Sequence, residues 1–199
     1  MNETRPNISG HRLTLEDYID DYKSRFWKTN KNACWKLERQ QTFRELNNPS
    51  WEASSRGDWP RALELLQKGR PEVKEYQERI LAHGFEFRRV RVVEEPITPY
   101  LIWELNSLLI RHEYGERIRI ITPDLIKNLE PNGPLPEIVV IGTDCVYQVL
   151  YDSDGLAEGA IQSTNKKEIK LWIELIAELY QKGEDINQFH DRKIAALQP

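Results

Sequence analysis

The sequence predicts an α/β fold built on a mixed β-sheet, on three observations. Residues 14–84 are mainly of helical periodicity, whereas short apolar runs typical of strands dominate from Phe85 onward. The first two of these runs flank a helical stretch at residues 98–115, as in a strand–helix–strand crossover. The last three follow one another across short turns, as in an antiparallel meander. We therefore expect N-terminal helices, a mixed sheet with one crossover and a C-terminal meander, and a closing C-terminal helix.

The N-terminal segment begins with a polar stretch and continues into the first helix. Residues 1–13 carry proline and glycine among polar side chains, which predicts a flexible arm. Thr14 can cap a helix near residues 14–27, where apolar residues recur at helical spacing. The following stretch at residues 35–43 is interpreted as a strand.

Two further helices are expected before the sheet region. Asp58 is a good N-cap for a helix that Gly69 ends. Pro71 is suited to the first turn of a second helix, which closes at Gly84. Together, residues 58–84 resemble one tetratricopeptide-like helical hairpin, and the whole of residues 14–84 is expected to pack on the sheet as a helical region.

The α/β core is expected at residues 85–183. Its strands are the runs FEFRRVRVV, RIRII, EIVVIG, CVYQVLY and GLAEGAIQ. Thr98 can cap the crossover helix, which places the first two strands parallel and close together. A long helix at about residues 166–182 closes the core, and residues 184–199 are interpreted as a polar tail.

Composition limits the function classes. A chain of 199 residues is long enough for one well-cored domain. Its net charge of −4 and isoelectric point of about 5.7 disfavour direct binding to nucleic acid. Neither a secretory signal nor an apolar run of membrane-spanning length is found in the sequence. Cys34 and Cys145 are far apart in the chain, so we expect two reduced thiols in a cytoplasmic protein.

Two of the predicted strands carry an Arg-x-Arg pattern. Side chains alternate between the faces of a strand, so Arg89 and Arg91 point to one face, and Arg117 and Arg119 share a face of theirs. If these strands pair in register, four guanidinium groups meet on one face of the sheet. Such a surface would suit an anionic ligand, because arginine pairs bidentately with carboxylates and phosphates.

Three more residues are expected to frame this site, namely Glu95, Tyr100 and Trp35. A competing interpretation is that the arginine face is simply solvent-exposed and paired with nearby glutamates. No glycine-rich phosphate loop or nucleophile elbow occurs in the sequence, and no cofactor or metal site is expected.

Five stretches resemble a bacterial family known as domain of unknown function 6879: CWKLERQQTF, RRVRVVEEPITPYLIWEL, YGERIRII, GPLPEIVVIG and LYDSDGLAEGA. The matching residues are Trp35, Leu37, Glu38, Arg89, Arg91, Glu95, Pro96, Tyr100, Gly115, Glu116, Ile118, Arg119, Leu135, Pro136, Asp152, Asp154, Gly155, Gly159 and Ala160. The likeness covers roughly residues 30 to 180. The chain departs from the family at residues 137–141, where members commonly carry an aromatic-rich strand.

The resemblance implies no established reaction. Members are mainly from actinomycetes and are often encoded near helix-turn-helix regulators, which suggests such a regulator as a partner. The family pattern is also similar to one half of a phospholipase D-like fold. Active members of that fold need a His-x-Lys-x4-Asp signature, and none of the four histidines of this chain is followed two residues later by lysine.

The leading hypothesis is a non-catalytic binding or regulatory protein that recognises an anionic small molecule or an acidic protein segment. An enzyme acting on a phosphorylated or acidic small molecule, with Glu95 as general base, is the first alternative. It would show a deep cleft with a carboxylate of raised pKa beside the arginines, whereas a regulator would show a flat or dimeric surface. The second alternative is a protein-interaction module with an apolar groove in the hairpin of residues 58–84. A homodimer is compatible with the sequence.

Overall fold

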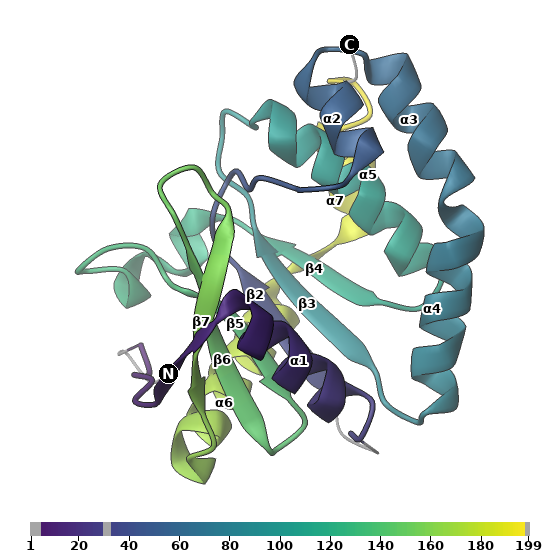
Figure 1. The fold of residues 1–199 in the computed structure, drawn as a ribbon. Helices are drawn as coiled ribbons and strands as arrows, with labels where there is room; N and C mark the ends of the chain where they lie inside the picture. Colours follow the sequence, from purple (N-terminus) through teal and green to yellow (C-terminus); the bar gives the residue numbers. More distant parts are fainter. Residues whose placement is uncertain (1–4, 30–32, 198–199) are drawn as a thin grey trace.

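The computed structural model describes residues 5–29 and 33–197, and its elements form an eight-stranded sheet with helices on both faces (Figure 1). The strands are β1 (His11–Thr14), β2 (Cys34–Glu38), β3 (Phe87–Val92), β4 (Arg117–Ile121), β5 (Glu137–Ile141), β6 (Cys145–Tyr151), β7 (Ala157–Ser163) and β8 (Glu184–Asp185). The helices are α1 (Leu15–Phe26), α2 (Pro49–Ser55), α3 (Trp59–Lys68), α4 (Arg70–Ala82), α5 (Pro99–Glu113), α6 (Lys166–Lys182) and α7 (Ile186–Lys193). Two short 3-10 helices, η1 (Pro123–Leu125) and η2 (Lys127–Leu129), precede β5.

The sheet is mixed, with strand order β1-β7-β6-β5-β2-β3-β4-β8. β2, β3 and β4 are parallel neighbours, and the other pairs are antiparallel. The predicted crossover is confirmed, because β3 and β4 are adjacent, parallel and joined through α5. The meander of β5, β6 and β7 and the closing helix α6 are confirmed as well.

One face of the sheet is covered by α6. Its apolar side packs on side chains from β2, β3, β4, β5 and β6, and this cluster includes Trp35, Leu37, Val90, Val92, Ile121, Ile138, Val140, Val146, Trp172 and Ile176. The burial of Trp172 and Ile176 follows from the helical spacing of apolar residues in α6. This face is therefore closed.

The opposite face is covered by two separate groups of helices. α5, with α2 and α7 against it, packs on β4 through a cluster that includes Ile118 and Ile120. α1 packs on β6 and β7 through a second cluster that includes Phe26 and Tyr147. The central strands β2 and β5 lie between these two groups (Figure 1). This arrangement leaves room over the middle of the sheet.

The helices at residues 58–84 do not form the predicted hairpin. α3 and α4 follow each other nearly end to end (Figure 1), because Gly69 between them keeps right-handed helical dihedrals of φ −76° and ψ −9°. Pro71 has no amide hydrogen and interrupts the hydrogen bonding at the junction. The chain therefore bends at Gly69 but does not reverse.

The two ends of the chain are more ordered than expected. Within the predicted arm at residues 1–13, β1 pairs antiparallel with β7, and residues 1–4 lie outside the described residues. Within the predicted polar tail at residues 184–199, β8 pairs with β4, α7 buries Ile186 and Phe189, and Ile194 just after the helix is buried as well. Residues 198–199 also lie outside the described part of the chain. Among the described helices, none combines the length and apolar character needed to cross a bilayer.

Candidate functional site

The middle of the sheet presents charged side chains toward the gap between α1 and α5. Side chains alternate along β2, so Trp35 and Leu37 point to α6 while Lys36 and Glu38 point to the gap. The parallel register places Lys36 beside Arg89 and Glu38 beside Arg91. Two charged positions from each of two neighbouring strands therefore share one face.

The predicted meeting of four guanidinium groups on one face is wrong. In the observed register Arg89 lies beside Ile118 and Arg91 beside Ile120. Paired residues of neighbouring strands point to the same face, so Arg117 and Arg119 point to the α6 face instead. Their side chains are 54% and 36% exposed, and their nearest carboxylates, on Glu86 and Asp185, are 3.9 and 3.6 Å away.

Two of the other predicted site residues also lie elsewhere. Trp35 is buried against α6, and the guanidinium of Arg88 lies 5.0 Å from the centre of its ring. Glu95 is exposed and forms a 2.7 Å ion pair with Lys193, and this hydrogen-bonded pair lowers the pKa of the Glu95 carboxyl. Tyr100, in contrast, lines the gap between the helices together with Arg89.

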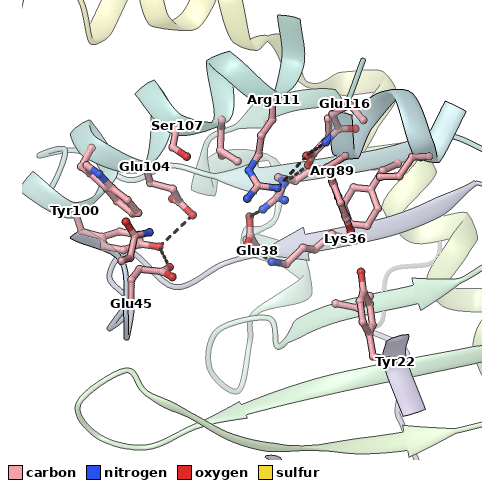
Figure 2. Close-up of a pocket in the computed structure, with 18 of the residues that line it drawn as sticks. Tyr22, Lys36, Glu38, Glu45, Arg89, Tyr100, Glu104, Ser107, Arg111 and Glu116 are labelled. Carbon is pink, nitrogen blue, oxygen red and sulfur yellow. Dashed lines mark hydrogen bonds and ion pairs between the residues drawn. The ribbon is translucent and has the colours of Figure 1, made fainter. Parts of the chain in front are cut away.

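The gap is a cavity of about 310 Å³, which is at the lower end of the range of small-molecule pockets (Figure 2). β2, β3 and β5 form its floor with Lys36, Glu38, Phe87, Arg89 and Val139. Its walls are Tyr18 and Tyr22 of α1, Tyr76, Gln77 and Ile80 of α4, Tyr100, Trp103, Glu104, Ser107, Leu108 and Arg111 of α5, and Glu45, Asn48 and Glu116 from loops.

A chain of ion pairs crosses the floor of this cavity. The carboxylate of Glu38 contacts Lys36 Nζ through one oxygen and Arg89 Nη1 through the other, each at 2.5 Å. Arg89 Nε donates to Glu116 at 2.6 Å, and Arg111 Nη1 lies 3.9 Å from the second oxygen of Glu116 (Figure 2). Burial alone would raise the pKa of Glu38, but the charges of Arg89 and Lys36 outweigh burial and lower it. The ion pairs therefore favour the ionised form of Glu38.

The cationic end of the cavity has an excess of positive charge. Lys36, Arg89 and Arg111 are three cations, and Glu38 and Glu116 are the two carboxylates that contact them. Arg111 makes the longest of these ion pairs, and 39% of its side chain is exposed. Its guanidinium is therefore the group at this end that can most easily turn toward a bound anion.

The other end of the cavity holds two carboxylates around one phenol (Figure 2). The hydroxyl of Tyr100 lies 2.9 Å from Glu45 Oε1 and 3.3 Å from Glu104 Oε1. A phenol has one hydrogen, so it can donate to one carboxylate, and the second contact is favourable when the other carboxyl is protonated. Burial raises the pKa of Glu104, and its 2.8 Å ion pair with Arg91 acts in the opposite direction.

Arg91 lies below the cavity with no exposure to solvent. It contacts Glu104 at 2.8 Å and the carbonyl oxygen of Val92 at 3.1 Å, and its Nη2 has no hydrogen-bond partner among the described residues. Nearby, Glu137 Oε1 accepts the backbone N–H groups of Arg39 and Gln40, each at 2.7 Å. Burial raises the pKa of Glu137 to about 7.

Several residues of this site were not among the predicted ligand-binding residues: Lys36, Glu38, Glu45, Glu104, Arg111 and Glu116. A signal for the first two was present in the stretch CWKLE, where apolar and charged residues alternate. The alternation assigns Trp35 to the apolar face and Lys36 and Glu38 to the charged one. No group of three or more histidine, cysteine or acidic residues in the described ranges is placed to hold a metal ion. Cys34 and Cys145 are free and buried.

The fold and the site together define an α/β domain with a charged cavity between its mixed sheet and its helices. Residues 20–191 match the model of the family described as "Domain of unknown function (DUF6879)". The chain belongs to this family, and the resemblance seen in its sequence motifs is confirmed. No curated protein matches the chain at a significant level.

The burial of Arg91 predicts a large difference between two arginine substitutions. Arg91→Met leaves Glu104 in the protein interior without its cation, which costs about 3–5 kcal/mol of unfolding free energy. Arg119→Met removes a half-exposed pair and costs less than about 1 kcal/mol. Urea unfolding of the two variants measures both values. Equal losses would contradict the assignment of the two strands to opposite faces.

Glu137 predicts a pH dependence of stability. Burial raises the pKa of Glu137 in the folded state, so the folded protein favours the protonated carboxyl. The contribution of this preference to the free energy of unfolding is complete below the ordinary pKa of 4.5 and is lost as the pH rises through about 7. Glu137→Gln keeps the acceptor oxygen and removes the titration. The stability of the variant relative to wild type should therefore rise by on the order of 3 kcal/mol between about pH 4 and about pH 8. Urea unfolding across this range tests it, and a difference that is constant with pH would refute it.

Proposed function

We propose that the protein binds a small molecule with an anionic group in the cavity between the sheet, α1, α4 and α5. The observation that carries this proposal is the enclosure of charged side chains from β2, β3 and α5 around one recess of about 310 Å³. Buried charges are costly to desolvate. A recess on which several polar groups converge is a candidate ligand site. The sequence predicted an anion site on an arginine-lined face of the sheet. The proposed site is instead this cavity.

The anionic group is placed at the cationic end. Lys36 and Arg89 are fixed there by Glu38 and Glu116, while Arg111 is more loosely held. A carboxylate or phosphate can accept hydrogen bonds from Arg111 and compensate the excess positive charge. Fixed cations that need no rearrangement lower the entropic cost of binding.

Catalysis is the second candidate function, and Glu104 favours it. A carboxyl with a raised pKa lines the cavity beside Arg91 and shares the hydroxyl of Tyr100 with Glu45. This chain of groups could pass a proton to or from a ligand, as in general acid–base catalysis. Glu95 is not suited to that role, because it is exposed and paired with Lys193 outside the cavity.

The wider role stays a prediction. A regulatory function with a helix-turn-helix partner follows from the family resemblance alone. The similarity to a phospholipase D-like fold is not used in the proposal of an anion-binding cavity. A cytoplasmic location is proposed from the two free, buried thiols, whose pKa values burial raises to about 12 for Cys34 and about 11 for Cys145. An interaction module at residues 58–84 loses its expected groove, because α3 and α4 do not lie side by side (Figure 1).

Filling the cavity should abolish ligand binding. Ser107→Phe places a ring in the recess from the wall formed by α5, and Gln181→Phe on the exposed side of α6 is the matched control. Native mass spectrometry of proteins purified from their own host should find a bound small molecule on wild type and Gln181→Phe and none on Ser107→Phe. The same three proteins are then tested for thermal shifts with a panel of carboxylated and phosphorylated metabolites.

A shift of the melting temperature that Ser107→Phe removes supports the proposal even without a co-purified ligand. A bound mass that persists in Ser107→Phe would contradict the site. Absence of both a bound mass and any shift in wild type would contradict the function.

A further inference from the structure

A second hollow adjoins the charged cavity and differs from it in chemistry. It has a volume of about 460 Å³ and lies between α1 and the middle of α4. Its lining is largely aromatic and aliphatic, consisting of Tyr18, Ile19, Tyr22, Lys23, Phe26, Trp27 and Tyr76. Below, this second hollow is called the aromatic groove.

The aromatic groove and the charged cavity lie next to each other. Three tyrosines, Tyr18, Tyr22 and Tyr76, line both. In the charged cavity the hydroxyl of Tyr22 points toward Lys36 (Figure 2). The ring of Tyr22 stacks on Phe26 at 5.3 Å, so its apolar faces continue the wall of the aromatic groove. The three tyrosines therefore bring an apolar surface up to the charged cavity.

The walls of the aromatic groove are well packed. Phe26 is buried and lies parallel to Tyr76 of α4 with 6.4 Å between ring centres, and Trp27 lies edge-on to the same tyrosine at 5.8 Å. The guanidinium of Arg79 lies 3.9 Å from the centre of the Trp27 ring and holds its outer face. These ring contacts fix the positions of the side chains that form the walls of the groove.

Apolar surface remains exposed in the groove. Ile19 and Tyr76, from its two sides, are each 38% exposed. Exposed apolar groups that line a recess next to a polar site are typical of a ligand-binding surface. Lys23 at the groove and Arg111 in the cavity place cations along the path of a ligand, so the groove suits the apolar part of an anion.

We infer that the ligand is an anionic amphiphile, whose carboxylate or phosphate group binds at Lys36, Arg89 and Arg111 and whose apolar tail lies in the aromatic groove. This inference rests on the proposed function, since it assigns the tail of a molecule whose head occupies the charged cavity. Each methylene that leaves water on binding raises affinity by up to about fourfold. A tail of several carbons thus contributes a large part of the affinity.

Titration calorimetry with two probes tests the inference. Methyl phosphate has the head group alone, and octyl phosphate, used below its micelle concentration, adds the tail. Wild type should bind octyl phosphate at least about tenfold more tightly than methyl phosphate, with a more negative heat-capacity change. Ile19→Glu should reduce this ratio to less than about threefold and leave methyl phosphate binding unchanged, because a charge in the groove excludes the tail. Leu125→Glu, at a similarly exposed position on η1, is the control and should keep the wild-type ratio.

The outcomes separate the two proposals. One outcome is that Arg111→Met weakens the binding of methyl phosphate, while octyl phosphate binds wild type no more tightly than methyl phosphate does. This outcome would overturn the inference and leave the proposed function standing. An octyl gain that survives Ile19→Glu would also overturn it, because the tail would then lie elsewhere. Absence of binding of both probes to wild type would count against both the inference and the anionic head site. A last test is co-sedimentation with phosphatidylcholine vesicles that contain phosphatidic acid. If wild type sediments with the vesicles and Ser107→Phe sediments equally, the protein binds a membrane surface and not a single bound molecule, and the inference is overturned.

Discussion

The charged side chains at the centre of the sheet depend on one another for their burial. Glu38 and Arg89 are each at most 6% exposed, and neither could lie beneath three helices without an opposite charge in contact. The parallel register of β2 and β3 supplies that contact, because it places Lys36, Glu38, Arg89 and Arg91 on the same face. Glu116 and Glu104 supply the remaining carboxylates from outside the two strands. The ion pairs between β2 and β3 are therefore the constraint on which the site depends.

The same constraint accounts for the position of the cavity. α5 covers β4 with apolar contacts, and α1 covers β6 and β7 in the same way, but β2 and β3 between them carry charges on this face. Apolar helices cannot close over charged groups without a large desolvation cost. The two helix groups thus meet the sheet on either side of the charges, and the recess between them remains open to a ligand.

Much of the fold could be predicted from the sequence, because its signals are local. The turns before β6 and β7, the Thr98 cap of α5 and the stripe of apolar residues in α6 each reflect interactions between residues close in the chain. α7 was missed because its two apolar residues, Ile186 and Phe189, lie among polar and charged ones. The bend at Gly69 was interpreted as a reversal because glycine commonly ends helices, whereas here it remains in the helical region.

The site was predicted less well, because it depends on which strands are neighbours and in what register. The alternation in β3 indicates that Arg89 and Arg91 share a face, but it does not indicate what lies beside them. A shift of one residue in the register of β3 and β4 moves every side chain of β4 to the opposite face relative to β3. The predicted register put Arg119 on the same face as Arg91, whereas Ile120 is the residue beside Arg91. Glu104 and Arg111 lie about two turns apart on α5, and only the packing of that helix over the sheet brings them to the strands.

A double-mutant cycle between Glu38 and Arg89 tests the central ion pair most directly. Glu38→Gln, Arg89→Met and the double variant are compared with wild type by urea unfolding. Each single change removes the contact between Glu38 and Arg89 and leaves the remaining group with only its second partner, Glu116 for Arg89 or Lys36 for Glu38. If the pair holds the centre of the sheet together, the double variant should be more stable than additivity predicts by at least about 1 kcal/mol. Losses that add within about 0.5 kcal/mol would mean that the two groups do not interact and would contradict this account of the site.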